Sequence, residues 1–277
     1  MSDLREAMEQ YLSLRRSLGF ELINVESTLR SFVAFAEREA LSHITTDLAL
    51  RWVDLSTAKE PSTLAGRLNV VRRFAIWRSA ADGRTQVPPE NLLPHRYRRK
   101  PPYIYSDDEI QRLVRAARKL PSSKGLRGPT YATLLGLLAA TGMRISEAVS
   151  LDRRDVDLDE GVLSIRESKF RKSRLVPVHV TTCDALSHYA RCRDRIFPSL
   201  QGVAFFVSER GTRVTHWAAR DNFAVVSRQI GIRKKIMGKR LGCGPRMHDM
   251  RHRFAALTLV DWYRAGINID SSLGFVG

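Results

Sequence analysis

Arginine and histidine side chains occur in two short motifs whose spacing suits the binding of a phosphate group. The first motif runs from Ala140 to Ala148 (ATGMRISEA). Gly142 permits a tight turn at the end of one helix, and Arg144 then projects from the start of the next. A guanidinium fixed there can hold two phosphate oxygens at once, which a flexible ammonium does less well. In the alternative interpretation, Arg144 pairs only with a neighbouring acid such as Glu147.

The second motif runs from Met247 to Ala255 (MHDMRHRFA). His248 and Arg251 are three residues apart, so on a helix both side chains lie on one face. An imidazole and a second guanidinium could therefore meet one phosphate. His252 and Arg253 are expected to point elsewhere and to have no chemical role.

The two motifs resemble the arginine boxes of the tyrosine recombinase (phage integrase) family, written TG(L/M)R(I/V)SE and HxLRH(T/S)FA. This resemblance covers residues 105–265 and implies DNA cleavage and rejoining through a 3′-phosphotyrosine, without a metal ion or other cofactor. It implies that Arg144 and Arg251 neutralise phosphate oxygens, that His248 moves a proton and that Glu147 orients a neighbouring arginine.

The resemblance also places a proton-moving lysine in the segment Glu167 to Arg174 (ESKFRKSR). Its position relative to the first arginine favours Lys169, with Lys172 as the alternative. The other cations of the segment are expected to contact the DNA backbone, namely Arg171, Lys172 and Arg174.

The family's nucleophilic tyrosine has no counterpart at its usual place in this sequence. We therefore expect a chain that is incomplete at its C-terminus and unable to cleave DNA alone. Tyr263 is the only tyrosine after Arg251, and we expect it to pack against the domain beside Trp262. The alternative function is a non-catalytic DNA-binding regulator of a recombination site, which competes with or joins full-length recombinase protomers. A metal-dependent nuclease would need a carboxylate cluster that the sequence lacks.

Two domains must position these residues. Apolar residues at helical spacing predict an all-α domain over residues 1–87, with a basic last helix at 62–77 that suggests a DNA clamp or a solvated face. Five prolines predict a basic linker over residues 88–104. It either follows the DNA backbone or serves as a solubilising hinge; the candidate DNA contacts are Arg96, Arg98, Arg99 and Lys100.

Residues 105–277 are predicted to form the catalytic domain, which begins with an N-cap at Ser106 and a helix through Leu120. Further helices are expected at 130–141 and 182–195. Strands are expected at 161–165, 174–178 and 203–207, and the rest is expected to be helical up to about residue 265. The fold class is therefore α+β and mainly helical: a small all-α clamp domain and a mixed α/β domain of the tyrosine recombinase type.

Composition favours double-stranded DNA as the partner, rather than a membrane or a small-molecule substrate. Lys and Arg number 46 against 29 Asp and Glu, a net charge of +17 that attracts polyanions. No segment approaches the ~20 continuous apolar residues of a membrane span. The spacing of the three cysteines, Cys183, Cys192 and Cys243, does not match a zinc site. We expect them to be reduced thiols. We expect a cytoplasmic, nucleoid-associated protein that uses no cofactor.

Overall fold

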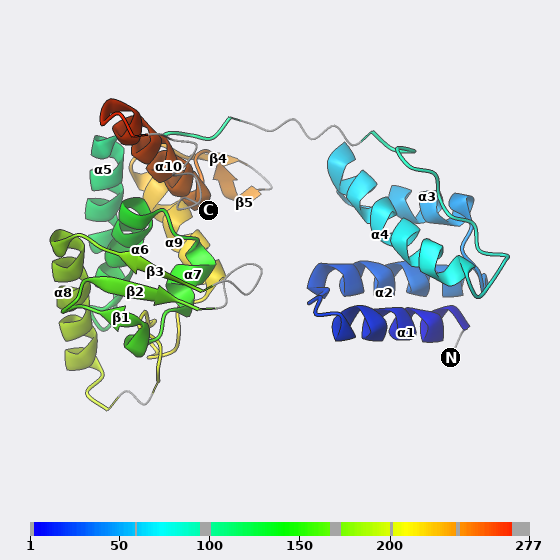
Figure 1. Cartoon of the computed structure of the whole chain (residues 1–277), viewed down its shortest axis with the longest axis horizontal. Helices are drawn as coiled ribbons and strands as arrows, with labels where there is room; N and C mark the ends of the chain where they lie inside the picture. Colours follow the sequence, from blue (N-terminus) through cyan, green and yellow to red (C-terminus); the bar gives the residue numbers. More distant parts are fainter. Residues whose placement is uncertain are drawn as a thin grey trace. The chain divides into compact units, whose positions relative to one another are not determined.

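The structure is a computed structural model, and it describes residues 3–58, 60–94, 101–166, 173–199, 202–236 and 239–267. By its internal contacts the chain divides into two compact units, Met1–Lys100 and Pro101–Gly277. Each is described by itself below (Figure 1). No helix among the described residues is both long enough and apolar enough to cross a membrane.

The described part of the first unit is a bundle of helices, as the sequence predicted: α1 (Asp3–Ser17), α2 (Ile23–Arg38), α3 (Thr46–Asp54) and α4 (Pro61–Ser79). Their apolar faces meet in one core that includes Leu12, Phe32 and Phe74. Local signals set the helix starts. Thr45 caps α3 by accepting a hydrogen bond from the amide of Leu48 at 3.1 Å, and a proline opens α4.

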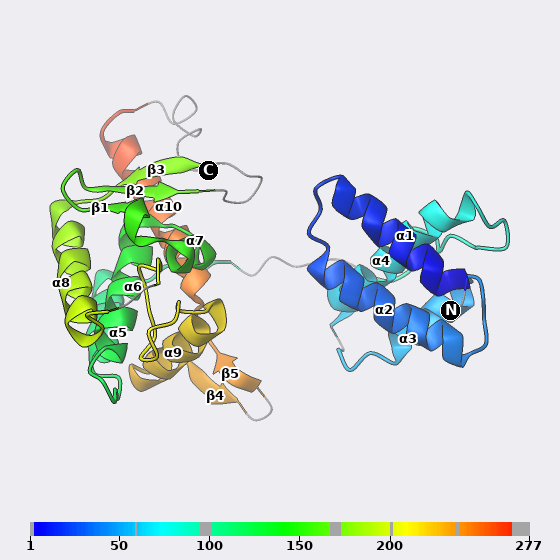
Figure 2. The same ribbon diagram turned by 90° about the horizontal axis from the view of Figure 1, so that it is seen from below.

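The second unit combines a helical body with a small antiparallel sheet. Its helices are α5 (Asp107–Arg118), α6 (Arg127–Thr141), α7 (Ile145–Ser150), α8 (Val180–Ile196), α9 (His216–Gln229) and α10 (Met247–Arg264), with a short 3₁₀ turn at Arg153–Asp155. The sheet has the order β1 (Val156–Asp157), β2 (Val162–Ile165), β3 (Arg174–Pro177). Figures 1 and 2 show it against one side of the helices. The predicted fold class, α+β and mainly helical, is confirmed.

Helix α6 runs through the centre of this unit, and its end prepares the candidate site. Leu134, Leu135 and Leu138 are buried, and the helix packs against α5, α8 and α10. It ends at Gly142, whose φ of 61° lies in the left-handed region that favours glycine. A Cβ at this position would lie 2.4 Å from the Phe254 ring of α10. Glycine is therefore required both by the turn and by the close approach of α10.

The predicted strand at residues 203–207 is wrong. These residues form isolated bridges, because the backbone changes partner within a few residues. The amide of Phe205 donates to the carbonyl of Leu151 at 2.9 Å, whereas the amide of Ser208 donates to Thr212 at 2.7 Å. The apolar run that suggested a strand reflects burial in the core.

A second hairpin lies where the sequence analysis expected helix. Strand β4 (Lys234–Ile236) pairs antiparallel with β5 (Lys239–Cys243). The segment is basic and shows neither helical nor alternating apolar periodicity, so its pattern favoured no element. Gly244 lets the chain leave the hairpin toward α10, since a Cβ there would lie 2.8 Å from the Ile232 carbonyl oxygen.

The predicted packing of Tyr263 against the domain is also wrong. Tyr263 is 77% exposed, and Leu257 and Val260 of the same helix are exposed as well. The reason is that the body of the unit covers the beginning of α10, and the buried residues of this helix lie within its first turn.

Gly142→Ala tests the turn that ends α6. Alanine must adopt an unfavourable φ and press its Cβ against Phe254, so we expect the free energy of unfolding of the second unit to fall by about 1–3 kcal/mol. Gly136→Ala is the matched control, because a Cβ there meets nothing within 4 Å. In a helix interior this control should stabilise by up to about 1 kcal/mol. Urea denaturation measures both, and equal stabilities would contradict the proposed constraint.

Candidate active site

Arg144 stands at the N-cap of α7, two residues after the turn that ends α6. The Glu147 carboxylate accepts a hydrogen bond from the Arg144 amide at 2.8 Å and another from its Nη1 at 2.9 Å. The side chain of Arg144 keeps 33% of its surface exposed, while that of Glu147 keeps 5%. The alternative ion-pair interpretation of Arg144 therefore describes part of its contacts, and a third of its side-chain surface remains accessible.

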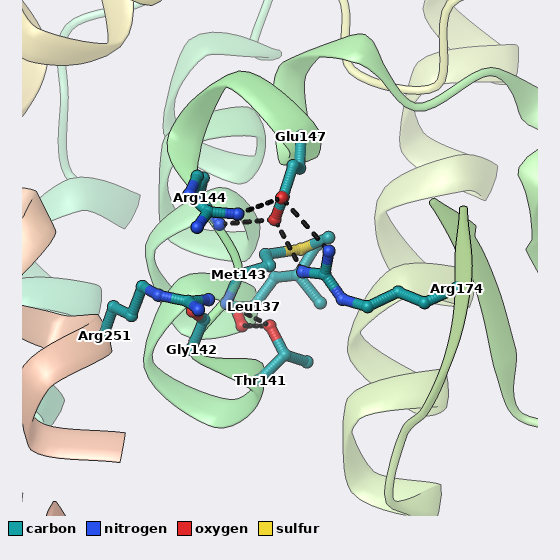
Figure 3. Close-up of polar contacts among 8 residues, drawn as sticks. All are labelled: Leu137, Thr141, Gly142, Met143, Arg144, Glu147, Arg174 and Arg251. Carbon is teal, nitrogen blue, oxygen red and sulfur yellow. Dashed lines mark hydrogen bonds and ion pairs between the residues drawn. The ribbon is translucent and has the colours of Figure 1, made fainter. Parts of the chain in front are cut away.

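Arg174 shares the same carboxylate. This residue begins strand β3, and its Nη1 and Nη2 donate to the two Glu147 oxygens at 3.2 and 2.8 Å (Figure 3). Burial by itself raises the pKa of the Glu147 carboxyl, but hydrogen bonds from Arg174 and Arg144 more than offset it, so the pKa is lowered. Glu147 thus stays ionised and joins the sheet to the arginine motif. This pairing was not predicted, because a basic residue at a strand start looks the same in sequence whether it contacts DNA or a carboxylate.

Arg251 reaches the site from α10. Its Nη1 donates to the carbonyl oxygen of Gly142 at 2.7 Å, which ties α10 to the end of α6. Burial lowers the pKa of Arg251, and the nearby positive charge of Arg144 lowers it further. In Figure 3 the Arg251 guanidinium lies at Gly142, and the Arg144 guanidinium lies above it. The structure therefore brings together the two arginines that the sequence motifs singled out.

His248 lies one turn before Arg251 on the same helix. Burial lowers the pKa of His248 below its usual value, and neighbouring positive groups, led by His252, lower it further. Its imidazole is therefore neutral near pH 7 and can accept a proton. The expectation that His252 points elsewhere is wrong: the two rings meet edge to face at 4.8 Å between centroids, as their spacing of four residues on a helix allows. Arg253 does point elsewhere, to the Tyr105 carbonyl oxygen and to Asp107.

The phosphate pocket is the name used below for a cluster of five side chains, and not for a cavity: Arg144, Glu147, Arg174, His248 and Arg251. The group contains three guanidiniums and one carboxylate, so it carries an excess of positive charge that an anion with several oxygens could balance. Within the described ranges, no three His, Cys, Asp or Glu side chains gather as metal ligands would.

The other candidate residues fall outside the described part of the chain. These are Lys169, Arg171 and Lys172 of the hairpin segment, and Arg96, Arg98, Arg99 and Lys100 of the linker.

Comparison with known proteins gives matches in sequence and in fold. The profile of the phage integrase family matches residues 104–271. The putative integrase/recombinase y4rB of Sinorhizobium fredii is 46% identical over 269 residues, which cover 96% of this chain and 84% of that protein. Tyrosine recombinase XerC of Thermodesulfovibrio yellowstonii is 29% identical over 73% of this chain and 64% of its own length.

Two solved structures share the fold at low sequence identity. The XerH site-specific recombinase bound to palindromic difH substrate has a TM-score of 0.63 at 18% identity, over 92% of this chain and 74% of that one. A lambda integrase tetramer bound to a Holliday junction has a TM-score of 0.62 at 18% identity, over 92% of this chain and 72% of that one.

Glu147→Gln tests the carboxylate that the arginines share. The pKa of Glu147 in the folded chain lies below its usual 4.5, so its ionised form stabilises the fold above that pH and this contribution is lost as pH falls through the folded-state pKa. We expect Glu147→Gln to cost on the order of 3 kcal/mol at pH 7. The gap to the wild type should narrow as the pH drops below 4.5.

Glu160→Gln, at an exposed position, is the control for this substitution and should change stability little. Urea denaturation at pH 7 and in acid gives both values. A destabilisation by Glu147→Gln that is the same at every pH would show that the ion pairs are not its source.

Proposed function

The chain belongs to the phage integrase family of site-specific tyrosine recombinases, and from this premise we propose that it binds double-stranded DNA at a recombination site and holds one backbone phosphate in the phosphate pocket. The observation that carries the proposal is the convergence of Arg144 and Arg251 at the Gly142 turn. The DNA-bound state of the XerH and lambda integrase structures supports the choice of partner.

Each pocket residue receives a role that follows from its contacts. Arg144 and Arg251 neutralise the non-bridging phosphate oxygens, and their fixed positions supply positive charge where it develops during phosphoryl transfer. Neutral His248 accepts or returns a proton. Glu147 holds Arg144 in place through two hydrogen bonds. We assign the remaining proton transfer to Lys169, with Lys172 as the alternative, on the family resemblance.

We further propose that a polypeptide of residues 1–277 binds DNA without cleaving it. Tyr263 lies 12 positions beyond Arg251 on one continuous helix, about 18 Å along its axis at 1.5 Å per residue. Both side chains lean toward the N-terminus of the helix, so the lean leaves their separation along the axis unchanged. One phosphate therefore cannot meet both. A chain that occupies a recombination site in this way would act as a regulator of full-length protomers.

The first unit is assigned to a DNA clamp, together with the basic linker. Within α4, Arg72 bonds the Pro88 carbonyl oxygen at 3.0 Å, and Arg67 lies 4.2 Å above the Trp52 ring, so both are partly used inside the unit. Arg73 is exposed on the same helix. It is the α4 cation that we assign to phosphate contact.

Salt dependence tests the DNA-binding proposal. Affinity for duplex DNA should fall steeply with salt, with a log–log slope of about −0.9 for each phosphate neutralised. Arg144→Ala should make this slope less steep by about 0.9, the value for one phosphate contact. The contribution of the other phosphate contacts should stay unchanged. Arg118→Ala, at an exposed position on α5, is the matched control. Fluorescence anisotropy across a salt series measures both, and affinity that ignores salt would refute DNA binding through phosphates.

Covalent capture tests the missing cleavage step. After incubation with end-labelled duplex DNA, residues 1–277 should give no complex that survives denaturing detergent, because the described structure places no tyrosine hydroxyl in the pocket. If such a complex forms and Tyr263→Phe abolishes it, Tyr263 is the nucleophile and the assignment above is wrong.

A further inference from the structure

Tyr105 is a buried residue near the start of the second unit, two positions before α5. Only 2% of its surface is exposed. Its hydroxyl donates a hydrogen bond to the carbonyl oxygen of Arg246 at 3.0 Å, across 141 positions of sequence. Because Arg246 is the N-cap of α10, this bond joins the beginning of the unit to the beginning of that helix. Burial raises the pKa of the Tyr105 hydroxyl well above its usual value, so the group stays protonated and acts as a donor near neutral pH.

The backbone of Tyr105 makes a second contact with α10. Its carbonyl oxygen accepts a hydrogen bond from Nε of Arg253 at 2.9 Å, and the same guanidinium pairs with Asp107. The Arg253 side chain is only 11% exposed, so this contact is largely shielded from water. Arg246 and Arg253 are seven residues apart, which is about 10 Å along the helix axis at 1.5 Å per residue. One residue thus holds both ends of the first two turns of α10.

His248 and Arg251 lie between these two attachment points. With 3.6 residues per turn, Arg251 lies about 160° and His248 about 140° around the helix from Arg253. The side of α10 that carries these two residues is therefore roughly opposite the side that Arg253 attaches to Tyr105. From that opposite side, Arg251 donates to the carbonyl oxygen of Gly142 at 2.7 Å. The start of α10 is thus held between the Gly142 turn and the segment of Tyr105.

We propose that Tyr105 is a positioning residue: by holding both ends of the first two turns of α10, it sets where Arg251 and His248 meet the phosphate. Tyr105 acts through the helix and carries no charge of its own. The proposal rests on the proposed function, in which those two side chains bind one backbone phosphate. A misplacement of about 1 Å can cost a factor of about 100 where function depends on exact geometry. Loss of one hydroxyl should therefore weaken the phosphate pocket without removing any charge from it.

The test compares two tyrosine hydroxyls in the chain of residues 1–277. Tyr105→Phe removes the hydroxyl and keeps the ring and the net charge. Tyr189→Phe is the matched control, because Tyr189 is fully buried on α8 and its hydroxyl accepts a hydrogen bond from the amide of Val207 at 2.9 Å. Each variant loses one buried hydrogen bond, so each should melt about 2–4 °C below the wild type. Circular dichroism measures the melting temperature and confirms that both are folded.

The first measurement is the pKa of His248, obtained by NMR of its imidazole without DNA; the signal is identified by its loss in His248→Asn. Burial holds this pKa below its usual 6.5. If Tyr105 holds α10 in place, Tyr105→Phe should expose the imidazole further and raise its pKa toward 6.5. Tyr189→Phe should leave it unchanged. Because Tyr105→Phe alters no charge, a change in this pKa reports a change in position.

The second measurement is the affinity for a labelled duplex of mixed sequence across a salt series. Tyr105→Phe should bind several-fold more weakly at moderate salt, and its log–log slope should be less steep by up to about 0.9, the value for one phosphate contact. In the Arg144→Ala background that contact is already lost, so Tyr105→Phe should have little further effect. A purely structural defect would instead add to the effect of Arg144→Ala.

Arg253→Lys tests the other attachment point. It keeps the positive charge, but an ammonium cannot reproduce the fork with which the guanidinium reaches both the Tyr105 carbonyl oxygen and Asp107. It should change the pKa of His248 and the salt slope in the same direction as Tyr105→Phe. Either variant alone is sufficient for the two measurements if the other does not fold.

The outcomes separate this proposal from the proposed function. If the pKa of His248 or the salt slope keeps its wild-type value in both variants, the role of Tyr105 is overturned while DNA binding stands. If Tyr189→Phe changes both quantities as far as Tyr105→Phe does, the effect is a general loss of stability and the role of Tyr105 is again overturned. If the wild type does not bind duplex DNA, the proposed function fails, and the His248 titration still decides whether Tyr105 positions α10.

Discussion

The Glu147 carboxylate accepts hydrogen bonds from two arginines at once, and the geometry of the phosphate pocket depends on this sharing. Guanidiniums that lie close together repel one another, as the pKa of Arg251 shows: it is lowered by burial and then by the charge of Arg144. One ionised, buried carboxylate offsets part of that repulsion and fixes where the guanidiniums point. The remaining positive charge is what a phosphate group would balance.

The Gly142 turn fixes the position of Arg251 relative to Arg144. The turn follows a buried helix, accepts the Arg251 hydrogen bond at 2.7 Å and lies against Phe254 of α10. Residues 109 positions apart in sequence are joined there. Because the interior around α6 is closely packed, a shift of α10 would move Arg251 relative to Arg144, and the pocket would lose its fit to one anion.

Features set by local sequence could be predicted, and features set by distant contacts could not. The capping box of Ser106 and Glu109 and the glycine that ends α6 follow from residue types a few positions apart, and both are present. The contact of His248 with His252 was also available from their spacing, but was overlooked.

The misses have different physical causes. The partner of Arg174 lies 27 residues away in sequence, and the exposure of Tyr263 depends on how far the body extends along α10. The β4–β5 hairpin is local, but its basic sequence has no apolar periodicity that would indicate a strand. A run of apolar residues indicates burial but does not show which segment it pairs with. For this reason residues 203–207 were expected to be a strand. The roles of Lys169 and of the linker cations stay predictions, since they lie outside the described residues.

The basic residues of this chain fall into two groups, those that pair with an acid and those that do not. Arg174 holds Glu147 through a planar, two-pronged contact, and Arg144 holds it through one guanidinium nitrogen and its amide, so both fix backbone elements. Lys234 and Lys235 are flexible point charges that pair with no acid among the described residues, and they are suited to attracting a polyanion before any exact fit exists. Salt screens exposed charges over about 8 Å at physiological ionic strength but affects buried pairs much less. If DNA binds as proposed, ionic strength should therefore govern how readily it is captured while leaving the arrangement of Arg144, Glu147 and Arg174 unchanged.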